Sequence, residues 1–342
     1  MTGFLNLEGV NKVFDPNLNL GERIAAKLGG AVETRAVHAV SDVSLSVRQG
    51  ETLGLVGESG CGKSTLGRVM AGILAPSAGR ILLDGKPVIE NGAKVTTRVQ
   101  TVFQDPFASL DPRMKVGDAV AEGPLAHGLT TRAAAKGYVA DWFGRVGLDP
   151  DWAGRYPHQF SGGQRQRIAI ARALAMQPDL LICDEPVASL DVSIQAQIIN
   201  LFLELRADLG LTCVFISHDL SVVRHVCDRT AVMYLGRIVE LGETETVFAR
   251  PAHPYTHALL ASVPRLVLDA EELVSFETIA GEIPSPLSPP PGCHFHPRCP
   301  LADARCRAER PPLQTVAEGR EAACHYAERE MELAAADLRS GL

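Results

Sequence analysis

The chain has 342 residues, 46% of them apolar and 21% charged, a composition typical of a globular protein with a large core and roughly two domains. Its 33 basic and 40 acidic side chains give a net charge of −7, which argues against a general affinity for nucleic acid or anionic lipid. No apolar run approaches the roughly 20 residues that cross a bilayer, and the opening MTGFLNLEGVNKVF lacks the basic and apolar regions of a signal peptide. We therefore expect a cytoplasmic protein with reduced thiols.

The first half of the chain predicts strands, a glycine-rich turn and a helical region. Residues 5–14, LNLEGVNKVF, predict a short strand, and residues 15–36 predict a loop or short helix inserted before the next strand. ETLGLV predicts a buried strand that ends in a glycine-rich turn, and KSTLGRVMAGIL predicts the helix after it. Residues 105–177 are predicted to be rich in helix, with glycine and proline between the helices.

The second half predicts further strands and then changes character. DLLICDEP and TCVFISHD are apolar runs that end in polar residues, as parallel strands of a covered sheet do. TAVMYLGRIVELG predicts a closing hairpin. After residue 250 the chain becomes rich in proline, and IPSPLSPPPG predicts a stiff linker at residues 284–291. Four of the eight cysteines follow that linker.

The stretch GESGCGKST at residues 57–65 fits the phosphate-loop pattern G-x-x-x-x-G-K-[ST] between a predicted strand and a predicted helix. Its glycines let successive backbone N–H groups point at a β-phosphate, and the helix N-terminus adds roughly half a positive charge. Lys63 is predicted to span the β- and γ-phosphates and Ser64 to ligate Mg²⁺. The competing interpretation is a glycine-rich turn with a chance lysine. The predicted ATP-binding residues of the loop are Gly57, Glu58, Ser59, Gly60, Cys61, Gly62, Lys63, Ser64 and Thr65.

Two further motifs favour phosphate chemistry. Asp184 and Glu185 end an apolar strand, where one carboxylate suits Mg²⁺ and the other suits the attacking water. In FSGGQRQRIAIARAL, Ser161 is a natural helix N-cap, and two glycines leave that helix end open to an anion. Because one ATP occupies the first loop, the simplest explanation of this second anion site is that it caps the γ-phosphate bound by another subunit.

Together these motifs resemble those of the ATP-binding cassette family of transporter ATPases. The matches are GESGCGKST, VFQDP with Gln104, SGGQ, LLICDEP, SLD ending at Asp191, and ISHD with His218, in the family's order over about residues 5–250. The resemblance implies an α/β P-loop NTPase fold, with a RecA-like mixed sheet and a helical subdomain, in an ATPase domain over residues 1–250. A C-terminal cysteine-containing extension follows over residues 251–342.

The resemblance also implies a role for each matching residue. Glu185 acts as general base, and His218 contacts the γ-phosphate. Gln104 contacts Mg²⁺ or the water and couples the helical region to a membrane subunit. The remaining implied roles are Mg²⁺ ligands at Ser64, Gln104 and Asp184, capping of the partner's ATP by Ser161, Gly162, Gly163 and Gln164, and a place at the interface between cassettes for Asp191.

Three positions depart from the family's pattern or are less specific. Phe14 stands where the family often has a tyrosine that stacks on adenine, and a core residue at a strand end is the alternative. Phe160 replaces the usual leucine before the signature serine. VASLD replaces the commoner TSALD, which moves the serine to Ser189 and leaves the polar contacts of that loop open.

The tail, from RPAHPYTHALLASVP to about residue 326, resembles the C-terminal extension of ATPases that serve oligopeptide and dipeptide importers. In that subfamily Cys293, Cys299, Cys306 and Cys324 resemble the ligands of a [4Fe–4S] cluster. Their spacing by itself, C-x5-C-x6-C-x17-C, lacks the C-x2-C of common zinc ribbons, and four thiolates suit either iron–sulfur or Zn²⁺. A Cys₃His zinc site that uses His294, His296 or His325, and unligated cysteines, stay open as alternatives.

The resemblance implies a subunit that binds and hydrolyses ATP with Mg²⁺ and so energises a peptide importer. Its implied partners are a second, similar ATPase (a different chain in most of the subfamily), two transmembrane permeases and an extracytoplasmic substrate-binding protein. It would then lie at the cytoplasmic face of the plasma membrane, held by the permeases. Uptake of nickel, glutathione or sugar is the alternative cargo, and a cassette ATPase acting on nucleic acid is a weaker alternative, because the chain is acidic and carries one cassette.

Overall fold

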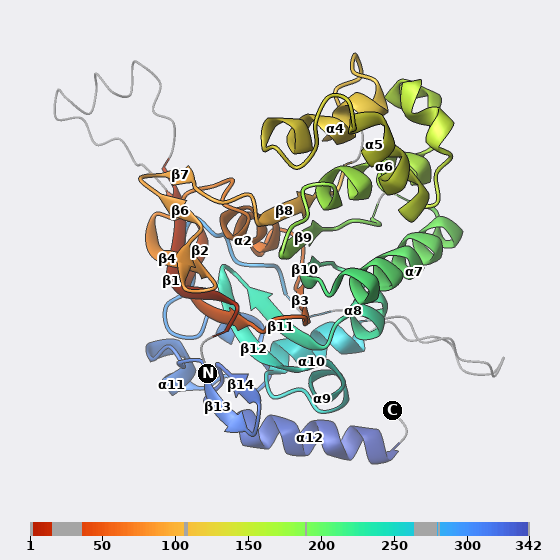
Figure 1. The fold of residues 1–342 in the computed structure, drawn as a ribbon. Coiled ribbons are helices and arrows are strands. Elements are labelled where there is room, and N and C mark those ends of the chain that lie inside the picture. The colour runs from red at the N-terminus through yellow and green to blue at the C-terminus, as the bar shows by residue number, and fades with distance from the viewer. Residues whose placement is uncertain are drawn as a thin grey trace.

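The computed structural model describes residues 3–15, 36–105, 109–188, 190–262, 279 and 281–340. The segment predicted as an insertion lies almost wholly outside the described residues, and so does Ser189. Two sheets, a group of helices at one end and a C-terminal unit at the other make up the fold (Figure 1). The predicted α/β fold with a mixed sheet is confirmed.

The larger sheet has eight strands in the order β13-β14-β12-β11-β3-β10-β9-β8. Its strands are β3 (Thr52–Val56), β8 (Val99–Val102), β9 (Leu180–Asp184), β10 (Thr212–Ile216), β11 (Arg229–Tyr234), β12 (Arg237–Glu243), β13 (Gln314–Ala317) and β14 (Arg320–Ala322). Within this order, the neighbouring strands β11, β3, β10, β9 and β8 run parallel to one another. Every residue of β3, β9 and β10 is buried. Short unbroken apolar runs become central parallel strands because both faces of such a sheet are covered.

The two faces of the central strand pack against different helices. Leu53 and Leu55 of β3 share a hydrophobic cluster with Leu66 and Met70 of α2 (Lys63–Met70). Gly54, between them in β3, faces Val223 and Cys227 at α8 (Leu220–Val226), where an added Cβ would come within 2.8 Å of Val223. Side chains alternate along a strand, so this pattern places α2 and α8 on opposite faces of the sheet.

A second, four-stranded sheet in the order β2-β1-β4-β5 packs over α2. Its strands are β1 (Leu5–Phe14), β2 (Val37–Val47), β4 (Ala78–Leu83) and β5 (Lys86–Pro87), and a two-residue pair β6 (Ile89–Glu90) with β7 (Ala93–Lys94) lies nearby. Alternating apolar residues of β1 and β2 point into the cluster around α2, so α2 is held between the two sheets.

The helical region connects β8 to β9 and lies at one end of the molecule (Figure 1). It contains α4 (Val116–Ala126), α5 (Ala135–Arg145) and α6 (Gly162–Leu174), and the later helices are α7 (Val192–Leu209), α9 (Thr244–Ala249), α10 (Pro254–Ala261), α11 (Ala304–Ala308) and α12 (Ala327–Ser340). Phe143 and Ile168 are fully buried among the helices. Within the described part of the chain, no helix has the length and apolar character needed to span a membrane.

The predicted hairpin of β11 and β12 is confirmed, and the large sheet continues past it into the C-terminal unit. Strand β14 pairs antiparallel with β12, and β13 pairs with β14. Arg320 of β14 donates to Glu240 of β12 at 2.7 Å, with side chains 3% and 0% exposed. Glu240 also accepts from the backbone N–H groups of Ala252 and His253. One buried carboxylate therefore holds the extension strand and the start of α10 to the core sheet.

The first prediction concerns this ion pair. Removing one partner leaves the other charge buried without compensation, which typically costs about 3–5 kcal/mol. We expect Arg320→Leu to lower the free energy of unfolding by about that amount in urea denaturation. Arg329→Leu is the matched control, because Arg329 is exposed on α12, and it should change stability by less than about 0.5 kcal/mol. Equal effects of the two variants would contradict this assignment.

Candidate nucleotide-binding site

The carboxyl ends of four parallel strands bring the predicted site residues to one edge of the large sheet. Strand β3 ends at the phosphate loop, β9 ends at Asp184 and Glu185, β10 is followed by His218, and β8 is followed by Gln104. Ligand sites of open α/β sheets lie at this edge, because the chain leaves each strand there through a loop. The register of the strands thus assembles residues that are far apart in sequence.

The phosphate loop has a backbone that only glycine can supply at two positions. Gly57 and Gly62 have φ values of 151° and 108°. A Cβ at Gly57 would lie 2.2 Å from the carbonyl oxygen of Met233, and a Cβ at Gly62 would lie 2.2 Å from that of Ala39. Neither contact is tolerable, since both involve backbone atoms. Helix α2 begins directly after Gly62 without a side-chain cap, which leaves its first N–H groups available to an anion.

The polar groups of the loop have partners inside the chain. Lys63 is 5% exposed, and its ammonium donates to the carbonyl oxygens of Gly57 at 2.7 Å and Glu58 at 3.0 Å. The Ser64 hydroxyl donates to Asp184 at 2.8 Å. Burial raises the pKa of Asp184, while the hydrogen bond from Ser64 and the nearby Arg68 act in the opposite direction. Serine and aspartate oxygens at this spacing form the kind of hard oxygen pair that Mg²⁺ prefers.

Two of the predicted catalytic side chains, Gln104 and His218, lie next to the same carboxylate oxygen of the third, Glu185. The Oε2 atom of Glu185 lies 3.0 Å from the Gln104 amide nitrogen, which donates to it, and 3.3 Å from Nδ1 of His218. Glu185 is half-buried, whereas the His218 side chain is 60% exposed. The sheet therefore places an acceptor for a proton beside two polar groups that face solvent.

Glu185 has an unusual backbone conformation for a residue with a side chain. Its φ is +49°, a region that favours glycine, and its N–H donates to the carbonyl oxygen of Ile216 at 2.9 Å. Strained conformations of this kind persist when surrounding structure holds them, and they occur frequently at functional sites. The cross-strand hydrogen bond to β10 supplies that restraint here.

A cavity of about 390 Å³ lies over the phosphate loop. Its lining combines the loop with the end of β1, the start of β2, the β11–β12 turn and the proline-rich segment: Phe14, Val37, His38, Ala39, Ser59, Gly60, Cys61, Gly62, Lys63, Ser64, Thr65, Gln104, Glu185, Leu235, Gly236 and Pro286. Phe14 is 39% exposed at its rim. Gly57 and Glu58, predicted to bind nucleotide, are not part of this lining.

The SGGQ segment forms a well-made helix end away from this cavity. Ser161 caps α6 by accepting from the Gln164 N–H, and the Gln164 side chain accepts from the Ser161 N–H at 2.9 Å. Gly163 is required by packing, because its Cβ would lie 2.6 Å from Ile194 of α7, whereas a Cβ at Gly162 would meet only Leu190, at 3.4 Å. None of the four signature residues lines the cavity over this chain's own phosphate loop.

The loop between β9 and α7 presents further exposed residues. Asp191 is exposed at the start of α7, and Val192 beside it is 81% exposed. An apolar side chain in that position has no packing role within the described chain.

The sequence did not predict the contact between the tail and the phosphate loop. Arg298 donates to both carboxylate oxygens of Glu58, at 2.8 and 3.0 Å, and its side chain is 3% exposed. The Glu58 N–H donates to the hydroxyl of Tyr255, whose ring packs on Tyr234 and Phe295. Glu58 therefore faces the extension. Its acidic side chain in the loop and the single arginine between two tail cysteines were the only signals available.

The four tail cysteines meet at a small, nearly closed cavity. Cys293, Cys299, Cys306 and Cys324 line it together with His296 and His325, whereas His294 lies outside its lining. No disulfide links them, and burial raises the pKa of each thiol. Among the described residues, no group of three or more histidine, cysteine or acidic side chains is placed to hold a metal ion.

Two family models match the chain. A model described as ABC transporter matches residues 40–188, and one described as oligopeptide/dipeptide transporter, C-terminal region, matches residues 239–306. The two matches cover the segments that hold the phosphate loop and the first three tail cysteines.

Curated relatives and solved structures agree with these matches. A probable peptide ABC transporter ATP-binding protein of Sinorhizobium fredii is 50% identical, over 84% of this chain and 82% of the relative. The oligopeptide transport ATP-binding protein AppF of Bacillus subtilis is 48% identical, over 94% and 96%. The structure of cbiO1 from Clostridium perfringens, part of an ABC transporter complex, matches with a TM-score of 0.58 and 32% identity, over 73% of this chain and 92% of that one. A dimeric ATP-binding cassette in a post-hydrolysis state, bound to ADP and Pi, matches with a TM-score of 0.58 and 25% identity, over 70% and 98%.

The second prediction tests the contact between Arg298 and Glu58. We expect Arg298→Met to weaken ATP binding roughly tenfold, about 1.4 kcal/mol, because the Glu58 carboxylate then stays uncompensated beside the phosphates. Binding of a fluorescent ATP analogue by the full chain measures the effect. Arg305→Met, on the exposed side of α11, is the control.

A double variant separates charge from packing. Adding Glu58→Gln to Arg298→Met removes the uncompensated charge, so it should recover part of the lost affinity. If the double variant binds ATP no better than Arg298→Met does, the charge pair is not the cause.

Proposed function

Because the chain belongs to the ABC transporter family, in the branch that carries the oligopeptide/dipeptide C-terminal region, we propose that it binds and hydrolyses ATP to energise a peptide importer. The observation that carries this proposal is the convergence of Lys63, Ser64, Asp184, Glu185 and Gln104 at one edge of the sheet. The relatives named above as peptide and oligopeptide transport proteins support peptides as the cargo.

We propose the following places for the nucleotide. The triphosphate lies along the N–H groups of the phosphate loop and the start of α2, and the Lys63 ammonium exchanges its two carbonyl partners for phosphate oxygens. Mg²⁺ would be held by Ser64 and Asp184, with Gln104 within reach. The Phe14 ring at the cavity rim would stack on the adenine.

A single chain leaves one side of the nucleotide open. Ser161, Gly162, Gly163 and Gln164 do not line the chain's own cavity, yet they form a capped helix end that suits an anion. We propose that they cover the γ-phosphate of ATP held by a second ATPase, with Asp191 at the interface. The solved dimer of a similar cassette supports a paired arrangement. We propose that this second ATPase is a similar but different chain.

In the closed pair, hydrolysis follows from the position of Glu185. Its carboxylate takes a proton from a water whose oxygen attacks the γ-phosphorus, while the bond from that phosphorus to the bridging oxygen breaks and ADP leaves. Gln104 and His218, which contact the same carboxylate oxygen, orient it and the γ-phosphate. Ser64 and Asp184 would hold Mg²⁺, which would supply positive charge against the charge that develops on the phosphate oxygens.

The third prediction tests the general base. Glu185→Gln keeps the shape of the side chain but removes the proton acceptor, so ATP binding should persist while turnover falls by at least about a hundredfold. Size-exclusion chromatography with ATP should show a stable dimer, because the closed state no longer decays by hydrolysis. Asp179→Asn, which lies in the segment before β9 and away from the cavity, is the control. Near-normal hydrolysis by Glu185→Gln would remove Glu185 from this role.

A groove next to Gln104 is the proposed docking place for a permease subunit. It lies between the end of β8 and helices α4 and α6, and its lining includes the exposed apolar residues Ile73 and Phe103. Gln104 follows Phe103 directly, so a segment seated in the groove would lie beside the residue that contacts Glu185. We propose two permeases on the paired ATPases, an extracytoplasmic substrate-binding protein that selects the peptide, and a position of this chain on the cytoplasmic face of the plasma membrane.

We also propose that Cys293, Cys299, Cys306 and Cys324 ligate a [4Fe–4S] cluster, with Zn²⁺ as the alternative. Support comes from the donor set, because all four thiols face one small cavity inside the tail. Backbone N–H groups point at the sulfur of Cys293 from Phe295 and His296, and at that of Cys324 from Tyr326, contacts that stabilise thiolates. Such a cluster would hold together a tail with few large apolar residues.

The fourth prediction tests the proposed iron–sulfur cluster by the iron and sulfide content of the purified protein. Protein purified without air should be brown and should contain iron and acid-labile sulfide, and Cys299→Ser should lose most of both. Cys227→Ala is the control, because Cys227 is buried in the core away from the tail. A colourless protein that carries zinc would favour the alternative, and one that carries neither metal would contradict both.

A further inference from the structure

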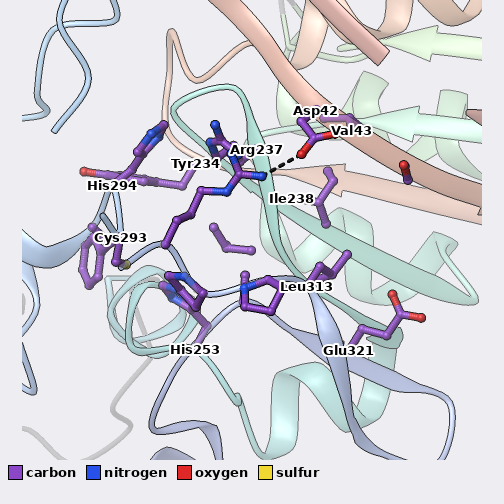
Figure 2. A pocket seen from close by; sticks show the side chains of 17 residues that line it. Asp42, Val43, Tyr234, Arg237, Ile238, His253, Cys293, His294, Leu313 and Glu321 are labelled. Atoms are coloured by element: carbon purple, nitrogen blue, oxygen red, sulfur yellow. Dashed lines mark hydrogen bonds and ion pairs between the residues drawn. The ribbon is translucent and has the colours of Figure 1, made fainter. Parts of the chain in front are cut away.

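A second cavity, of about 300 Å³, lies between the core and the tail (Figure 2). Its walls come from β2, from the β11–β12 hairpin and from two tail segments, one at Cys293 to Phe295 and the other at Arg310 to Leu313. It shares no lining residue with the nucleotide cavity. Its volume is at the lower end of the range, roughly 300–1,000 Å³, of pockets that bind small molecules.

Two arginines line this cavity. Arg237 comes from the core hairpin and Arg310 from the tail. Burial and the nearby Arg310 lower the pKa of Arg237 to about 10, with Asp42 acting in the opposite direction. Two guanidinium groups that face one space repel each other unless an anion lies between them.

The carboxylates at the cavity do not balance both arginines. Asp42 pairs with Arg310 at 2.6 Å, and the two side chains are 54% and 44% exposed. Figure 2 shows Glu321 at the end of the cavity away from His294, and no ion pair joins Glu321 to either arginine among the described residues. Arg237 therefore has no partner carboxylate among the described residues.

Two buried nitrogen atoms of the cavity residues have no hydrogen-bond partner. They are Nε of Arg237 and Nδ1 of His294, neither of which contacts an acceptor or donor among the described residues. Buried polar atoms are almost always paired, so the unpaired Nε leaves the Arg237 guanidinium only partly satisfied inside the described structure. Arg237 and His294 come from the core and the tail respectively, and both are labelled at the same cavity in Figure 2.

We propose that this cavity binds a small oxyanion, a phosphate or carboxylate group, between Arg237 and Arg310. Guanidinium groups match both kinds of oxyanion with two parallel hydrogen bonds. Arg310 can take part because its exposed pair with Asp42 is weak and exchangeable. Arg237 follows Gly236 in the chain, and the Gly236 N–H donates to the carbonyl oxygen of Cys61 in the phosphate loop at 2.8 Å.

The test uses the full chain saturated with MgADP, so that the phosphate loop is already occupied. Inorganic phosphate and succinate are titrated separately at constant ionic strength, and the melting temperature and the heat of binding are measured. We expect the melting temperature to rise with the concentration of at least one of the two probes until it reaches a plateau. The probe that binds more tightly identifies the ligand group. Absence of a saturable effect with both probes would overturn the proposal.

Variants assign the effect to this cavity. Arg237→Met and Arg310→Gln should each weaken binding of the effective probe at least tenfold, while Arg307→Gln, an exposed tail arginine outside the cavity lining, should not change it. Without anion, Arg237→Met should melt no lower than the unaltered chain, since it removes a buried cation without a partner. Binding of the probe that is equal in Arg237→Met, Arg310→Gln and Arg307→Gln would place the anion elsewhere and overturn the proposal.

Discussion

The parallel register of β8, β9, β10 and β3 is the constraint on which the rest of the structure depends. It brings the ends of four strands to one edge, and the phosphate loop, Asp184, Glu185, His218 and Gln104 follow those ends directly. A one-residue shift in any of these strands would turn its buried side chains to the other face. The burial that stabilises the sheet thus also sets the distances within the site, such as 3.0 Å between Gln104 and Glu185.

The C-terminal extension is continuous with this core. Its strand β14 extends the large sheet, the buried Arg320 pairs with Glu240, and Arg298 reaches Glu58 in the phosphate loop. Aromatic packing of Tyr234, Tyr255 and Phe295 fills the space between these two ion pairs. The tail therefore contacts the phosphate loop directly, and the proposed cluster and anion sites both lie along this same junction.

Much of the site could be predicted from sequence because its motifs are local. The loop around Lys63, the acids at the end of β9 and the cap at Ser161 each depend on a few neighbouring residues, and the positive φ values at Gly57 and Gly62 favour glycine there. Other features depend on long-range packing. The requirement for Gly163 comes from Ile194 of α7, and Glu58 turns toward Arg298, a residue far along the chain.

The sequence by itself determined the family, the α/β fold and the order of the phosphate-binding motifs, because strand and helix periodicity and loop chemistry are properties of short segments. Only the tertiary structure decided which faces meet. It placed the signature residues outside the chain's own cavity, gathered the four tail cysteines, and set Arg237 against Arg310. The physical reason is that hydrophobic periodicity describes only residues that are close in sequence. These contacts join residues that are far apart in sequence, and the packing of whole helices and strands sets them.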